Sequence, residues 1–139
     1  MRLSILRRFR SDEKGAAMVE MALVLGVIFL PMVFGVIEFG RGVWAKTTIT
    51  AAAREGVRFA AVRGTDYAAA GNTVADSTAV ADYVKARTQL TGIVVKPTWT
   101  PDKNPGSEVK VQVTYNYVPI ISLFSSRVIQ STSKQRIAY

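Results

Sequence analysis

The clearest pattern in the 139-residue sequence is an apolar run near its amino terminus. Residues 16–37 are apolar apart from one glutamate, Glu20, and no residue in the stretch 21–37 is charged. At about 1.5 Å per residue, a helix over this run matches the thickness of the hydrocarbon core of a bilayer. The run therefore predicts a transmembrane helix over residues 16–37. We expect Pro31 to kink it, because proline removes the backbone bond to Val27.

Basic residues are more numerous before the apolar run than after it. Residues 1–15 carry Arg2, Arg7, Arg8, Arg10 and Lys14 against Asp12 and Glu13, which leaves a net charge of +3 (five minus two) out of the formal +8. Only Arg41 and Lys46 follow the run within a comparable distance. Because the more basic flank stays in the cytoplasm, we expect a cytoplasmic amino terminus and a carboxy-terminal part outside the inner membrane.

A helical pattern continues beyond the run. Apolar and small residues recur at spacings of three and four at Ile49, Ala52, Ala53, Gly56, Phe59 and Ala60. We therefore expect residues 38–63 to extend the helix, and residues 64–66 to end it. The arginines along this extension do not form one stripe, since Arg63 falls on the opposite side from Arg54, and a solvated or interdomain face is the better interpretation.

Residues 64–139 predict a small α+β domain. A connection over residues 67–73 should lead to a second helix, capped by Asp76 or Ser77. Its apolar positions continue to Leu90, and Tyr83 and Leu90 should share the face that packs on a sheet.

Three antiparallel strands are expected after this helix. The strongest signal is a strict alternation, with Val109, Val111, Val113, Tyr115 and Tyr117 on one face. A preceding strand holds Val95 and Trp99, with Pro97 either keeping it at a sheet edge or breaking its ladder of hydrogen bonds, and residues 101–106 have the composition of a hairpin turn. Residues 128–138 predict a third strand. The apolar segment 119–124 is either a loop over the core or a patch that binds a partner.

Composition argues against catalysis. The chain holds neither histidine nor cysteine, so it lacks the commonest general base, the commonest metal ligand and any disulfide. No phosphate-binding glycine loop is present either. We expect no enzymatic activity, no cofactor and no metal site. We also expect no nucleic-acid partner, because basic and aromatic residues do not interleave as they do in single-strand binders.

A short motif joins the basic leader to the apolar run, Lys14-Gly15-Ala16-Ala17-Met18-Val19-Glu20. Its carboxylate would cost about 2.5–3.5 kcal/mol near the centre of a membrane unless a partner pairs with it. A glycine, a small residue and a glutamate five positions after the glycine resemble the processing site of type IV prepilins. The resemblance implies cleavage between Gly15 and Ala16 by a prepilin peptidase, and pairing of Glu20 with the new amine of Ala16 on a neighbouring subunit.

Two further stretches narrow the resemblance. They are Val36-Ile37-Glu38-Phe39-Gly40-Arg41 and Ala51-Ala52-Ala53-Arg54-Glu55-Gly56-Val57-Arg58-Phe59-Ala60. These stretches resemble the TadE-like proteins of tight-adherence (Flp-type) pilus systems. The residues that carry this likeness are Glu38, Phe39, Gly40, Arg54, Glu55, Gly56 and Arg58.

The resemblance implies a minor pilin or pseudopilin of a type IV-like pilus, with residues 1–15 as a cleaved leader. Its implied partners are the prepilin peptidase, the major Flp-type pilin, a companion TadF-like pseudopilin, the inner-membrane assembly platform and the lipid bilayer. It leaves open a role in the filament, at its tip or in membrane assembly, and a TadF-like role in place of the TadE-like one.

Other functions fit parts of the pattern. An ordinary secretory signal peptide would have a shorter apolar region followed by small residues, whereas Glu38, Phe39 and Arg41 follow this run. An uncleaved single-pass anchor that displays an extracytoplasmic binding domain explains the hydropathy alone. A membrane-tethered DNA-binding protein is a third alternative, because the chain is basic.

Overall fold

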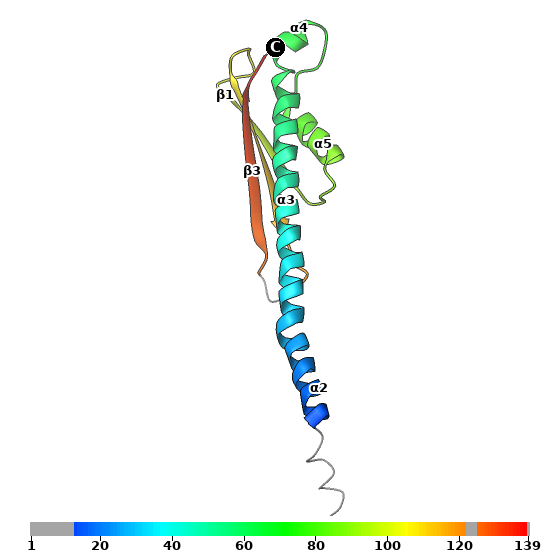
Figure 1. The fold of residues 1–139 in the computed structure, drawn as a ribbon. Coiled ribbons are helices and arrows are strands. Elements are labelled where there is room, and N and C mark those ends of the chain that lie inside the picture. The colour runs from blue at the N-terminus through cyan, green and yellow to red at the C-terminus, as the bar shows by residue number, and fades with distance from the viewer. Residues whose placement is uncertain (1–12, 122–124, 139) are drawn as a thin grey trace, which may run out of the picture. The chain divides into compact units, whose positions relative to one another are not determined.

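The computed structural model describes residues 13–121 and 125–138 (Figure 1). In chain order its elements are the helices α2 (Glu13–Leu23), η1 (Val24–Phe29), α3 (Leu30–Ala61), α4 (Thr65–Ala69) and α5 (Ser77–Arg87), and the strands β1 (Val94–Thr100), β2 (Glu108–Tyr117) and β3 (Arg127–Arg136). The chain divides into two compact units, Met1–Phe39 and Gly40–Tyr139. The basic residues predicted to form the start of the leader lie outside the described residues.

The first unit consists, where it is described, of apolar helix. The helical stretch Gly15–Ala61 contains an 18-residue window with a mean hydropathy of 2.4, and 6% of that window is buried. Large side chains such as Met18, Ile28 and Phe39 are more than half exposed. An apolar helix with so little burial is unlike the core helix of a soluble domain, and it is compatible with a single-pass membrane anchor.

The apolar helix changes its winding shortly before Pro31. Residues Val24–Phe29 form a π-helix, and the N–H of Leu30 bonds to the carbonyl of Leu25, five residues back. A wider turn before the proline gives its ring room next to the carbonyl groups of the preceding turn. The backbone is thus irregular in the turns that precede Pro31. The kink predicted at Pro31 itself stays a prediction.

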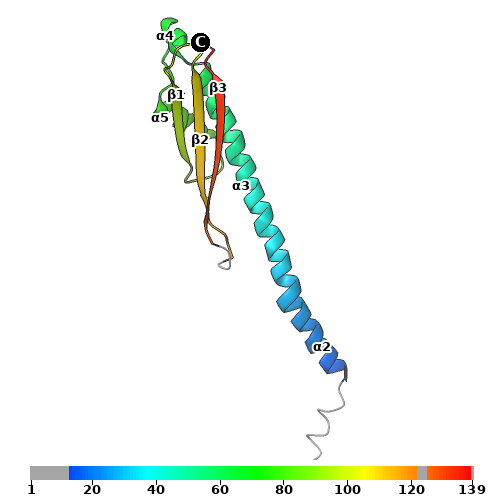
Figure 2. The same ribbon diagram turned by 90° about the vertical axis from the view of Figure 1, so that its left-hand side faces the viewer.

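The second unit is a three-stranded antiparallel sheet with helices on one face (Figure 2). β2 lies in the centre, where Val111 pairs with Pro97 of β1 and with Ser133 of β3. The predicted alternation is confirmed, because Val109, Val111 and Val113 are fully buried between more exposed neighbours. The predicted α+β class, the three strands and the edge position of the Pro97 strand are confirmed as well.

The core of this unit uses small residues on the helix and branched residues on the sheet. On α3 the buried side chains are Ala45, Ile49, Ala52, Ala53, Val57, Ala60 and Ala61. Alanine offers little apolar area, so its contribution depends on a close approach of helix and sheet. The predicted periodic positions face the core, with Phe59 only partly buried, and Ala45, Val57 and Ala61 are buried in addition to them.

The second helix differs from the prediction at its carboxy-terminal end. Asp76 caps α5 as expected, since its Oδ1 accepts from the N–H of Ala79 at 2.6 Å. The helix ends at Arg87, however, because Thr88 is extended and its hydroxyl bonds to the carbonyl of Val84. Leu90 is therefore buried outside the helix, and the prediction that it shares a helical face with Tyr83 is wrong. Within α5 the buried side chains are Val80 and Val84.

The hairpin turn between β1 and β2 is held by one carboxylate. Asp102 accepts hydrogen bonds from the hydroxyl of Ser107 and from the backbone N–H and side-chain amide of Asn104. Gly106 has a φ of +92°, a conformation that favours glycine. The hydroxyl of Ser107 and the N–H of Asn104 lower the pKa of Asp102 below its ordinary value, because they stabilise the ionised form. The turn predicted over residues 101–106 is confirmed.

Candidate functional site

The predicted processing residues share one regular helix. Gly15, Ala16 and Glu20 lie on α2, where Gly15 is partly exposed and the other two are exposed. Ala16 and Glu20 are four residues apart, so they occupy one helix face about 6 Å apart along the axis. Within the described part of the chain Glu20 has no ion-pair partner. The face is thus accessible to a second molecule.

The motif residues that follow the apolar run differ in burial. Among the described residues, Glu38 is a charged residue that is buried, with 7% of its surface exposed. Its side chain is not isolated, because it takes part in an interaction. Phe39, next to it, is 74% exposed, and Gly40 has open space where a Cβ would stand. In the second unit, the Arg41 guanidinium lies 5.5 Å from the ring centroid of Tyr117.

The motif residues 54–58 include one that is required for packing. A Cβ on Gly56 would lie 2.7 Å from Cγ2 of Val84 and 3.1 Å from Cγ1 of Val111, so α3, α5 and β2 meet at this glycine. The charged neighbours Arg54, Glu55 and Arg58 are all exposed. Among the described residues Glu55 and Arg58 form no ion pair with each other. Their charges are therefore available to a partner.

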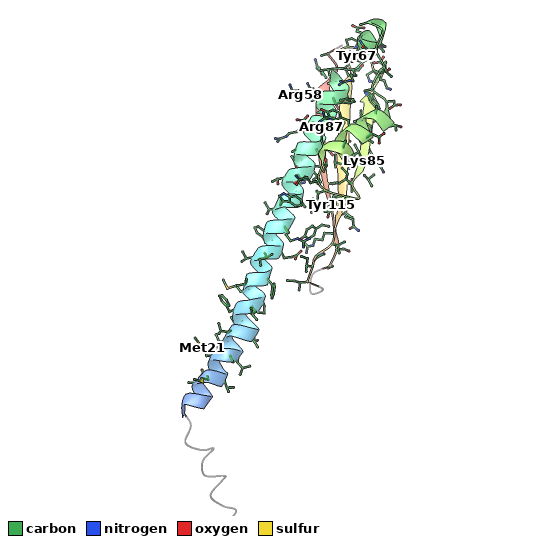
Figure 3. The ribbon with its side chains drawn as sticks, turned by 90° about the vertical axis from the view of Figure 1, so that its right-hand side faces the viewer. Met21, Arg58, Tyr67, Lys85, Arg87 and Tyr115 are labelled. Carbon is green, nitrogen blue, oxygen red and sulfur yellow. The ribbon has the colours of Figure 1, made fainter. Side chains whose placement is uncertain are left out.

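Sequence reasoning missed a stack of rings and guanidinium groups between α3 and α5. Phe59 and Tyr83 stack with ring centroids 4.0 Å apart. The guanidinium carbon of Arg63 lies 3.9 Å from the ring centroid of Phe59, and the guanidinium carbon of Arg87 lies 3.9 Å from the ring centroid of Tyr83. Figure 3 labels Arg87, which belongs to α5, and Tyr67. The guanidinium carbon of Arg63 lies 5.6 Å from the ring centroid of Tyr67. The signal in the sequence was an aromatic residue followed by arginine four positions later, once on each helix.

A shallow pocket opens at the Arg63 end of this stack. Its volume is about 430 Å³, and its lining consists of Phe59, Arg63, Tyr67, Ala79 and residues 71–75. Arg63 also donates through Nη1 to the carbonyl of Phe59 at 3.3 Å, which fixes its position. The described residues contain no group of three or more potential metal ligands. The lining thus combines two aromatic rings and a guanidinium group with smaller side chains.

A comparison with protein families found a match that covers most of the amino-terminal helical region. Residues 15–58 match the family model of TadE-like protein. This segment is TadE-like. The match begins at Gly15 and ends at Arg58, so it contains the predicted processing residues, the first motif stretch and the second as far as Arg58. The resemblance inferred from these residues is confirmed for this segment.

Comparisons with curated proteins and with solved structures found no match. The TadE-like segment ends one residue before Phe59, so α5, the sheet and the stack of rings lie outside it. Gly56 belongs to the TadE-like segment and packs against side chains of α5 and β2, which lie outside that segment. The family therefore bears on the amino-terminal helix rather than on the surface of the sheet.

Proposed function

We propose that this chain is a minor pilin or pseudopilin that takes part in assembly of a tight-adherence (Flp-type) pilus. The observation that carries the proposal is a TadE-like segment that starts at Gly15, with Glu20 exposed on the same apolar helix. The role is structural and not catalytic. A prepilin peptidase removes residues 1–15, and the mature chain begins at Ala16.

Pairing of charges at the start of the mature helix is the assembly step. A carboxylate in the membrane costs about 2.5–3.5 kcal/mol near its centre, and a salt bridge to an amine offsets part of that cost. Ala16 and Glu20 lie on one exposed helix face, so the amine of one subunit and the carboxylate of the next can pair between chains. Because both positions are fixed on rigid helices, each pair also sets the axial register of neighbouring subunits.

The remaining partners follow from the same proposal. The apolar helix holds the chain in the inner membrane with its amino terminus in the cytoplasm, and the sheet lies outside. The major Flp-type pilin, a TadF-like pseudopilin and the assembly platform contact it there. The exposed charges of Arg54, Glu55 and Arg58 are available for such contacts.

The proposal is tested by Glu20→Gln in a strain that lacks the chromosomal copy. Glutamine keeps the size of the side chain and removes its charge, so the helix still inserts while the pair with Ala16 is lost. We expect pili counted by electron microscopy to fall at least tenfold, with the protein level in the membrane unchanged. Asp82→Asn is the matched control, since it removes an exposed carboxylate from α5 and should leave pili unchanged.

Normal piliation with Glu20→Gln would contradict the assembly role. It would favour the alternative of a single-pass anchor that displays an extracytoplasmic binding domain, because such an anchor inserts at least as well without the carboxylate. Loss of both Glu20→Gln and Asp82→Asn proteins from the membrane would instead indicate a general defect in folding. Glu20→Asp would then test whether a carboxylate at position 20 restores piliation.

A further inference from the structure

Three contacts along α3 show how the helix runs past β2, β3 and the residues that follow β3. At the far end, the N–H of Ala138 bonds to the carbonyl of Ala61 at 2.9 Å. Further back along the helix, Nζ of Lys46 donates to the carbonyl of Gln130 at 2.6 Å. Arg41 lies over Tyr117, the last residue of β2. β2 therefore ends beside the residues at which the chain enters this unit from the apolar run.

Exposed apolar side chains gather at this end. Val118 and Ile120, which follow β2, are 60% and 74% exposed, and Val128 at the start of β3 is 68% exposed. On α3, Trp44 is 49% exposed and lies one turn after Arg41. Elsewhere the outer face of the sheet is polar, with residues such as Lys96, Gln112 and Thr132 at paired positions. The concentration of apolar groups is thus a local feature of this end.

Basic residues outnumber acidic ones at this end, where Glu38 stands three residues before Arg41 on α3 and is 7% exposed. The sequence holds no acidic residue over residues 40–53 or over residues 109–139. The basic residues nearest the apolar side chains are Arg41 and the exposed Arg127. Aromatic and basic groups around a small apolar surface are typical of segments that rest in the headgroup region of a bilayer, where anionic lipids attract the basic groups.

We propose that this surface, formed by Val118, Ile120 and Val128 with Trp44, Arg41 and Arg127, rests in the headgroup layer of anionic phospholipids. The occupant follows from chain connectivity, because Arg41 comes four residues after the last residue of the apolar run. Two or three residues of extended chain past Tyr117 reach about 7–10 Å, enough to place Ile120 among headgroups and upper acyl chains.

The inference rests on the membrane anchor of the proposed function, and the test separates the two. The natural chain has no cysteine, so single-cysteine variants of the full chain can each carry one nitroxide label. We choose Ile120→Cys and Val128→Cys in the surface, Val27→Cys in the apolar run and Asn72→Cys at the other end of the second unit. Each is placed at one copy per nanodisc of phosphatidylglycerol and phosphatidylethanolamine, and the label's accessibility to oxygen and to a water-soluble nickel complex is measured.

Labels at 120 and 128 are expected to favour oxygen over nickel at least threefold relative to the label at Asn72. The label at Val27 should favour oxygen more strongly still. Replacing phosphatidylglycerol by phosphatidylcholine should reduce the preference at 120 and 128 and leave that at 27 unchanged.

Two results would overturn the inference and leave the anchor intact. In one, the labels at 120 and 128 match Asn72 while Val27 favours oxygen. In the other, the labels at 120 and 128 are shielded from both reagents, which would indicate a protein contact. A label at Val27 that is accessible to nickel would contradict the membrane anchor itself and, with it, the surface contact. Equal values in the two lipids would overturn the role of the anionic headgroups.

Discussion

At Gly56, α3 approaches α5 and β2 too closely for a side chain. A methyl group added there would stand 2.7 Å from Val84 and 3.1 Å from Val111, both of them buried and both β-branched. Such side chains have few rotamers with which to move away. The absence of a Cβ at this one position therefore allows the alanine-rich face of the helix to approach the sheet.

The variant Gly56→Ala is expected to lower the free energy of unfolding by about 1 kcal/mol or more. Overpacking costs roughly 1–3 kcal/mol, whereas the better helix propensity of alanine recovers at most about 1 kcal/mol. Urea unfolding of the full chain in detergent, followed through the combined fluorescence of Trp44 and Trp99, measures the change. Gly42→Ala on the same helix is the control, because open space surrounds its Cβ position. Equal stability of the two variants would contradict the close approach at Gly56.

Asp102 offers a second prediction for a single residue. Ser107→Ala removes the hydroxyl that contributes most to its lowered pKa, so the pKa of Asp102 is expected to rise toward its ordinary value. Because the folded pKa is depressed, the carboxylate stabilises the turn fully above its ordinary pKa, and this contribution is lost as the pH falls through the folded pKa. The chemical shift of the Asp102 carboxyl carbon, followed by NMR during an acid titration, measures the pKa of Asp102 in the natural protein and in Ser107→Ala. A pKa of Asp102 that is the same in both proteins would contradict the role of Ser107.

Single residues were predictable from the sequence where the pattern around them was regular. Pro97 at a sheet edge and Asp76 as a helix cap each follow from one local rule, and both are confirmed. The buried state of Glu38 was not predicted, because a single glutamate next to an apolar run gives no signal of burial in the sequence. The same holds for the reason why residue 56 is glycine, which requires knowing that Val84 and Val111 meet there.

At the scale of elements, α5 is attached to α3 partly by the stack of Phe59 and Tyr83. The two rings are nearly parallel, with 27° between their planes, and each carries a guanidinium group on its outer face. Stacked aromatic pairs contribute about 0.5–1.5 kcal/mol beyond the area they bury. The stack therefore adds to the small core formed by Val80 and Val84.

A double-mutant cycle tests this attachment. Phe59→Leu and Tyr83→Leu keep an apolar side chain at each site and remove the ring contact. We expect a coupling energy of about 0.5–1.5 kcal/mol between the two sites in urea unfolding. The pair Ile49→Val and Tyr83→Leu is the control, with no coupling expected for side chains that belong to separate contacts. Additive effects of Phe59→Leu and Tyr83→Leu would show that the stack contributes no stability of its own.

Strands were more predictable than helix ends. The alternation along residues 108–117 fixes which face is buried, so β2 and its buried face follow from a period of two, whereas the pairing register with β1 and β3 does not. The end of α5 did not follow, because apolar residues continue to Leu90 while a hydroxyl bond from Thr88 stops the helix. The π-helix at Val24–Phe29 was missed as well, since hydropathy does not register how the backbone is wound around Pro31.

For the whole molecule, the sequence distinguishes two parts with different surroundings. The apolar run is exposed along its length and has no core of its own, whereas residues beyond Gly40 bury a core between a sheet and two helices. The TadE-like segment spans both parts and was recognisable from short motifs. The surface at the end of β2 was not recognisable, because it brings together residues near 41, 118 and 128 that only the fold places side by side.

The central claim is that the chain is processed as a pilin before it takes part in assembly. The most direct measurement is the amino-terminal sequence and intact mass of the protein from membranes of host cells with and without the prepilin peptidase. The account predicts a chain that begins at Ala16 when the peptidase is present and at Met1 when it is absent. A chain that begins at Met1 in both strains would contradict it and would leave a membrane-anchored protein that carries a small α+β domain.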